Sequence, residues 1–95
     1  MSEIIDGAVR KLDAKLGGSF DGSAKFLIDD EGAIICDAAG VRADDAEADV
    51  TLSADIETFR EMLDGDLNPT AAYMAGRLRI DGDMGQAMKL GAALS

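Results

Sequence analysis

The sequence predicts an α+β domain in which helices cover one face of a sheet. Apolar residues recur at helical spacing near both ends of the chain, whereas residues 24–53 mostly alternate between apolar and polar side chains. Such alternation, in place of wholly apolar runs, indicates strands with one face in water. At 95 residues the chain suits a single domain, spanning residues 1–95, with room for one ligand cavity at most.

The first predicted element is an amphipathic helix from Glu3 to Leu16. Its apolar residues repeat at helical spacing, and charged residues occupy the opposite side. Gly17 and Gly18 should end this helix, because glycine readily takes the left-handed conformation of a helix C-terminus.

A meander of three or four strands is predicted next. Residues 24–28 alternate as a strand, residues 29–32 (Asp-Asp-Glu-Gly) form a hairpin turn, and residues 33–37 return beside the first strand. Residues 41–46 can form a short edge strand, although their alternation is weak. Residues 49–53 alternate clearly and predict a strand with one wet face.

Two helices, one strand and a final helix complete the chain. Ser53 or the residues after it cap a helix that Gly65 ends, and a short helix follows at residues 69–75. A strand at 77–81 then leads to Asp83, which caps the last helix. Because that strand follows two helices, it can join the sheet beside the first strand by a crossover connection, right-handed if the pair is parallel.

Composition excludes several function classes. There is no histidine, and Cys36 is the single cysteine, so imidazole-based catalysis, an internal disulfide and a cysteine-rich zinc site are not expected. The formal charge of −10 opposes binding to nucleic acid and to anionic membranes. Because the chain has no long apolar run and no signal-peptide pattern, we expect a cytoplasmic protein without stable membrane insertion. Cys36 itself is predicted to be a small core residue rather than a nucleophile.

The acidic and glycine-rich segments do not complete a ligand motif. Asp64, Asp66 and Asn68 occupy the first three ligand positions of a calcium loop, but Pro69 replaces its glycine and Ala75 its glutamate. No glycine array of the phosphate-binding kind is present. We therefore predict no metal and no cofactor, and we interpret these residues as turns and caps.

Tyr73 and four methionines leave two uses open. Tyr73 is either a core or boundary aromatic whose hydroxyl reaches solvent, or a cavity wall whose hydroxyl meets a ligand. Met62, Met74, Met84 and Met88 either fill gaps in the core or form a deformable interior that suits lipids of variable shape. Composition alone favours core packing.

The chain from the Phe20 region to Leu94 resembles the sterol carrier protein domain. The resemblance rests on Ala-Asp-Val-Thr-Leu-Ser at 48–53, Gly-Asp-Leu-Asn-Pro at 65–69, Ala-Tyr-Met-Ala-Gly-Arg-Leu-Arg-Ile at 72–80, Gly-Asp at 82–83 and Ala-Met-Lys-Leu at 87–90. It implies a five-stranded mixed, mostly antiparallel sheet with helices on one face and an apolar tunnel between the layers. It also implies that residues 41–46 supply the middle strand.

By this resemblance, ten large and mainly apolar residues line the tunnel: Ile56, Phe59, Leu63, Tyr73, Met74, Leu78, Ile80, Met84, Met88 and Leu94. The implied function is that of a monomer, not an enzyme, that binds and carries a hydrophobic ligand such as a sterol, fatty acid, acyl-CoA or phospholipid. The alternative is an accessory or interaction domain that keeps the fold and partners a lipid-metabolising enzyme without carrying ligand itself.

Overall fold

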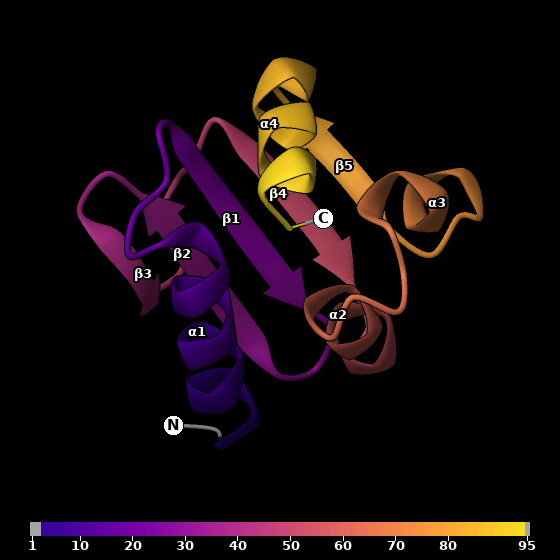
Figure 1. Cartoon of the computed structure of the whole chain (residues 1–95), viewed down its shortest axis with the longest axis horizontal. Coiled ribbons are helices and arrows are strands. Elements are labelled where there is room, and N and C mark those ends of the chain that lie inside the picture. The colour runs from indigo at the N-terminus through magenta and orange to yellow at the C-terminus, as the bar shows by residue number, and fades with distance from the viewer. Residues whose placement is uncertain (1–2, 95) are drawn as a thin grey trace.

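Helices and strands follow one another along residues 3–94, the part of the chain that the computed structural model describes (Figure 1). In chain order they are α1 (Glu3–Leu16), β1 (Ser23–Ile28), β2 (Gly32–Asp37), β3 (Gly40–Ala43), β4 (Val50–Ala54), α2 (Ile56–Leu63), α3 (Pro69–Met74), β5 (Arg79–Gly82) and α4 (Met84–Leu94). The predicted α+β class and the predicted order of elements are confirmed.

The five strands form one sheet in the order β3-β2-β1-β4-β5, with β1 at its centre. β1 is parallel to β4, and the other neighbouring strands are antiparallel. The expectation that the strand after α3 lies beside β1 is wrong, because β4 takes that place and β5 pairs with the outer side of β4. The burial of the two strands explains the order: Val50 and Leu52 of β4 are buried, whereas Arg79 and Asp81 of β5 are exposed and suit an edge.

β3 forms the opposite edge of the sheet. The edge position expected for residues 41–46 is confirmed for their first part. This strand is the middle one of the five along the chain, as the resemblance implies, and it is outermost in space. It pairs with β2 alone, with Val41 opposite Cys36. Arg42 on this strand forms an ion pair with Asp37 of β2, at 3.0 Å between Nη2 and Oδ2, which links the edge strand to its neighbour.

Helices α1, α2 and α4 cover one face of the sheet, as predicted (Figure 1). Leu12 of α1 and Leu90 of α4 are fully buried, and Phe59 of α2 is 1% exposed. The Phe59 ring lies 5.1 Å from the Phe26 ring of β1, between centroids, at a tilted angle. The core therefore lies between the central strand and these three helices.

The other face of the sheet is only partly open to water, which corrects the sequence prediction. Lys25 and Ile35 are paired in register and project from this outer face, yet Ile35 is 2% exposed. The Nζ atom of Lys25 lies 2.9 Å from Oδ1 of Asp45. The connection between β3 and β4 has to cross β2 and β1, because these two strands lie between β3 and β4 in the sheet. The ion pair shows that the connection crosses them on the outer face.

Capping side chains set the starts of α2 and α3, and a glycine allows the pairing of the edge strand β5. Asp55 caps α2, its Oδ1 accepting from the Thr58 amide at 2.8 Å, so the cap falls two residues after Ser53. Asn68 caps α3 in the same way, with Pro69 at the first helical position. Gly82 has a φ of +110°, and a Cβ there would lie 2.4 Å from the Asp49 carbonyl oxygen, so the pairing of β4 with β5 requires glycine.

Candidate functional site

Six of the predicted site residues gather around an apolar groove between α3, α4 and the β4–β5 edge of the sheet. We call this the α3–α4 groove; it has a volume of about 310 Å³ and is lined by Leu52, Pro69, Thr70, Tyr73, Met74, Leu78, Ile80, Met84, Ala87, Met88 and Gly91. None of these lining residues is charged. The groove thus offers an apolar surface with two hydroxyl groups, those of Thr70 and Tyr73.

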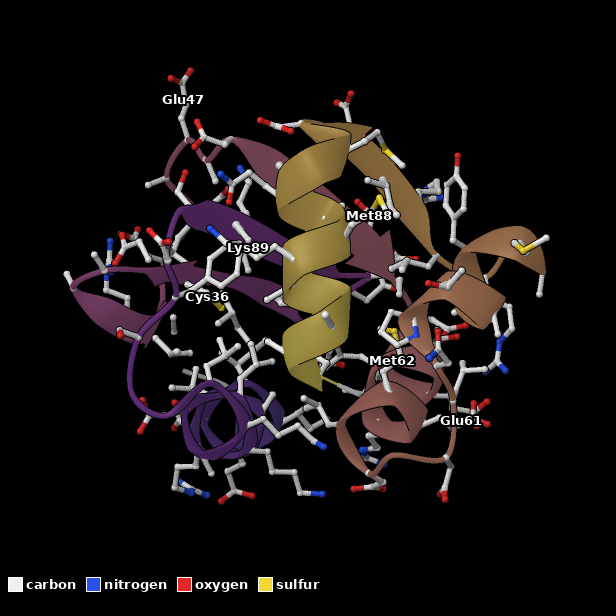
Figure 2. The ribbon with its side chains drawn as sticks, turned by 45° about the horizontal axis from the view of Figure 1, so that its top comes forward. Cys36, Glu47, Glu61, Met62, Met88 and Lys89 are labelled. Atoms are coloured by element: carbon white, nitrogen blue, oxygen red, sulfur yellow. The ribbon has the colours of Figure 1, made fainter. Side chains whose placement is uncertain are left out.

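The groove has a buried floor and an exposed rim. Leu52 and Leu78 on the floor are each 2% exposed. The rim carries the exposed large hydrophobic side chains of Met74 (82%), Met88 (74%), Met84 (46%) and Tyr73 (45%). Figure 2 places Met88 on the side of α4 that faces β5. Exposed apolar side chains that line a groove are typical of surfaces that bind a ligand or a partner.

The methionines divide in a way that composition did not indicate. Met62 is 1% exposed and belongs to the core, so core packing is confirmed for it. For Met74, Met84 and Met88 core packing is wrong, because all three are exposed at the rim. Tyr73 lies at the same rim, where both of its open uses, boundary aromatic and cavity wall, are compatible with its position.

Backbone geometry and one arginine hold the walls of the groove in place. Pro69 is buried at the start of α3, and a Cβ added to Gly91 of α4 would lie 3.8 Å from Pro69 Cβ, so the two helices meet at a small residue. Arg77, in the turn after α3, donates from Nε to Thr58 Oγ1 at 3.2 Å and forms an ion pair with Glu61. The turn is therefore tied to α2, and the Arg77 charge is directed away from the groove.

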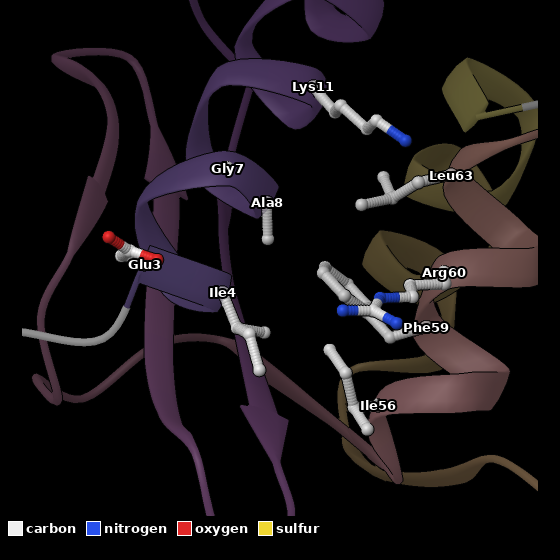
Figure 3. A pocket seen from close by; sticks show the side chains of 9 residues that line it. All are labelled: Glu3, Ile4, Gly7, Ala8, Lys11, Ile56, Phe59, Arg60 and Leu63. Atoms are coloured by element: carbon white, nitrogen blue, oxygen red, sulfur yellow. The ribbon is translucent and has the colours of Figure 1, made fainter.

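Three other predicted residues, Ile56, Phe59 and Leu63, line a different pocket (Figure 3). This α1–α2 pocket has a volume of about 330 Å³ and is lined by Glu3, Ile4, Gly7, Ala8, Lys11, Ile56, Phe59, Arg60 and Leu63. It shares no lining residue with the α3–α4 groove. Leu94 lines neither pocket and is a core residue, 2% exposed.

The ten residues therefore do not line one continuous tunnel in the part of the chain that is described. Met62, Leu90 and Leu94 are at most 2% exposed and belong to the same core cluster as Leu63 and Leu78. Side chains of the core thus occupy the interior between α2 and α4, and the two pockets lie apart from each other.

Five lining residues of the groove were not predicted from the sequence: Leu52, Pro69, Thr70, Ala87 and Gly91. Helical spacing could have found Ala87 and Gly91, which follow Met84 and Met88 on α4 by three residues each. Leu52 lies opposite Ile80 in the β4–β5 pairing. Its place in the groove could be known only after the strand order was known.

Cys36 is buried in the core, which confirms its predicted role as a small core residue. Burial, and to a lesser extent the nearby Asp37 carboxylate, raises the pKa of its thiol to about 12, against the smaller opposing effect of Arg42. We expect iodoacetamide at pH 8 to leave Cys36 unmodified in the native protein and to alkylate it fully in concentrated urea, as measured by mass spectrometry. Rapid alkylation of the native protein would show that β2 opens frequently.

Within residues 3–94, no three histidine, cysteine, aspartate or glutamate side chains lie close enough together to hold a metal ion. No helix in the same range is long and apolar enough to cross a membrane.

Solved structures of sterol carrier proteins have the same fold. Sterol carrier protein 2 like 2 from Aedes aegypti superposes with a TM-score of 0.76 at 20% identity, over 94% of each chain. Sterol carrier protein-2 from Aedes aegypti, solved in complex with the C16 fatty acid palmitate, gives a TM-score of 0.77 at 19% identity, over 100% of this chain and 97% of that one. At these identities the likeness shows the fold.

The relatives found by sequence are larger proteins, and only a segment of each matches this chain. Hydroxysteroid dehydrogenase-like protein 2 from Danio rerio is 54% identical over 44 residues, which are 46% of this chain and 11% of that protein. Peroxisomal multifunctional enzyme A from Dictyostelium discoideum is 39% identical over 54 residues, or 57% of this chain and 12% of that protein. The matching segments thus span only a small part of these relatives.

The sequence profile of the SCP-2 sterol transfer family matches residues 7–95, which is nearly the whole chain. This match agrees with the strand order, with the helices on one sheet face and with the superposed structures. The chain belongs to the SCP-2 sterol transfer family.

Proposed function

We propose that this domain binds a hydrophobic ligand in the α3–α4 groove and carries it without changing it chemically. The observation that carries the proposal is the exposed rim of Tyr73, Met74, Met84 and Met88 above a buried apolar floor. A ligand lying in the groove removes this apolar surface from water. The palmitate complex of a protein with the same fold supports a lipid as the ligand.

Size and chemistry favour binding through burial. The groove volume of about 310 Å³ lies at the lower end of the range of roughly 300–1,000 Å³ that is usual for ligand pockets. Because no charged residue lines it, affinity depends mainly on apolar burial, at about 25 cal/mol per Å². Methionine side chains are flexible and polarisable, so the rim can adapt to ligands of different shape. We therefore expect low selectivity among long-chain lipids.

A second candidate is an accessory domain that docks on an enzyme through the same rim. It is favoured by the relatives, because the segment that matches this chain is a small part of hydroxysteroid dehydrogenase-like proteins. In that case protein, rather than lipid, covers the exposed methionines. Direct ligand binding by the isolated domain distinguishes the two.

An uncharged fluorescent fatty alcohol should bind the domain one to one and be displaced by unlabelled long-chain lipid. Met88→Asp should weaken this binding at least about tenfold, near 1.4 kcal/mol, because it places a carboxylate at the apolar rim. Binding is measured by fluorescence titration. Since Met88 is 74% exposed, the variant should fold normally.

Ala93→Asp is the matched control, because Ala93 is exposed on the same helix but does not line the groove. It adds the same charge and should leave the affinity within about twofold of the original. If no uncharged long-chain probe binds the folded domain, the carrier function is wrong and the accessory function is favoured.

A further inference from the structure

The α1–α2 pocket differs from the α3–α4 groove in its charge. Its walls are apolar, with Ile4 and Ala8 from α1 facing Ile56, Phe59 and Leu63 from α2 (Figure 3). Its lining also contains three charged residues, whereas the lining of the groove has none. The pocket thus combines an apolar surface with ionic groups, as a site for an amphiphile requires.

Only positive groups among these three are directed at the pocket. Figure 3 shows the Arg60 guanidinium reaching from α2 into the space beside α1, and the Lys11 amine extending from α1 towards Leu63. The Glu3 carboxylate points away from α2 in the same view. Of the two, Lys11 is paired with Asp64, so the charge that Arg60 presents to the pocket is the unpaired one.

Arg60 is available to bind a ligand anion. Six other cations form ion pairs: Lys11, Lys25, Arg42, Arg77, Arg79 and Lys89. Among residues 3–94, no hydrogen bond or ion pair holds the Arg60 guanidinium. An unpaired guanidinium offers a fork of N–H donors that matches a carboxylate in shape and charge.

The acids near Arg60 are engaged elsewhere. Asp64 accepts from Lys11 Nζ at 2.7 Å, and its pKa is lowered by that hydrogen bond and by the charges of Lys11, Arg60 and Lys15. Three cations thus surround one carboxylate. Glu61 is paired with Arg77. Neither of these two acids therefore forms an ion pair with Arg60.

We propose that the α1–α2 pocket is a second binding site, separate from the α3–α4 groove, for an anionic amphiphile with a carboxylate head group. The acyl chain lies against Ile4, Ile56 and Phe59, and the carboxylate accepts hydrogen bonds from the Arg60 guanidinium. Lys11, which is paired with Asp64, lies at the same rim. The groove selects its ligand by apolar surface alone, whereas this pocket also selects its ligand by charge.

Dodecanoate and dodecanol, which have the same chain length, provide the test. Backbone amide NMR shifts should locate dodecanoate at Gly7, Ala8, Phe59 and Arg60, and dodecanol should leave these amides unchanged. Arg60→Gln should weaken dodecanoate binding at this pocket about tenfold. Arg79→Gln is the control, because it removes the same charge from an exposed position on β5 outside both pockets and should have no effect.

The outcomes separate this site from the groove. If dodecanoate shifts only amides of the groove, such as those of Leu78 and Met88, or if Arg60→Gln leaves the affinity within twofold, the second site is wrong and the carrier function of the groove stands. If dodecanoate shifts the α1–α2 amides and no long-chain probe shifts those of the groove, the second site is supported and the proposed function of the groove is wrong.

Discussion

Replacing Phe26 by alanine should lower the free energy of unfolding by about 3–5 kcal/mol. Phe26 is 1% exposed on the central strand, between β2 and β4, and its ring packs against Phe59 with 5.1 Å between centroids. Alanine leaves a cavity beneath the helices that a sheet strand cannot move to fill. Because domains of this size are stable by roughly 5–15 kcal/mol, the variant should be close to unfolding.

Urea unfolding followed by circular dichroism measures this loss. Met74→Ala serves as the control, since Met74 is 82% exposed, and it should change the free energy of unfolding by no more than about 0.5 kcal/mol. A Phe26→Ala protein that unfolds at nearly the original urea concentration would show that the space between β1 and α2 collapses easily, contrary to the packing described above.

Removing α4 should abolish cooperative folding. The helix buries Ala87, Leu90 and Leu94 against the sheet, and each fully buried leucine contributes about 1.5–3 kcal/mol. Lys89 adds a link to the start of the sheet, donating to the Asp21 carbonyl oxygen at 2.8 Å. We expect a chain that ends at Met84 to be aggregated or molten, with a broad unfolding transition and strong binding of a hydrophobic dye.

Two point variants on α4 test whether folding depends on the buried face of the helix. Leu90→Asp places an unpaired carboxylate at a fully buried position and should be as disruptive as the truncation. Met88→Asp, two residues earlier on the exposed rim, should retain a sharp unfolding transition. A soluble, cooperatively folded Leu90→Asp protein would show that α4 is not part of the core.

The two pockets give this small domain two different surfaces for ligands. The groove exposes methionine and tyrosine side chains on a fixed floor, whereas the α1–α2 pocket faces its ligand with Lys11 and Arg60. An uncharged probe is therefore expected to report on the groove, and an anionic probe on the α1–α2 pocket as well. The variants at Met88 and Arg60 test the two surfaces independently.

Local features of the sequence determined the elements of this fold. The predicted bounds of the first helix agree with those of α1, and the Asn68-Pro69 start of α3 is confirmed. Asp55, which is among the residues after Ser53 that were expected to cap this helix, is the cap of α2. These features depend on backbone groups within a few residues of the side chain that satisfies them, so the sequence order is sufficient to predict them.

The position of each element was decided by the tertiary structure. Both β4 and β5 alternate, and only pairing across the sheet shows that β4 lies beside β1. Met62 and Met88 both occur in apolar helical patterns, yet one is 1% exposed and the other 74%. Arg60 lies between Glu57 and Glu61 in the sequence, a charge pattern that is typical of a solvated helix face. Only the packing of α1 beside α2 makes it a pocket residue. Periodicity reveals which side of an element is apolar; which neighbour covers that side depends on contacts between residues far apart in the chain.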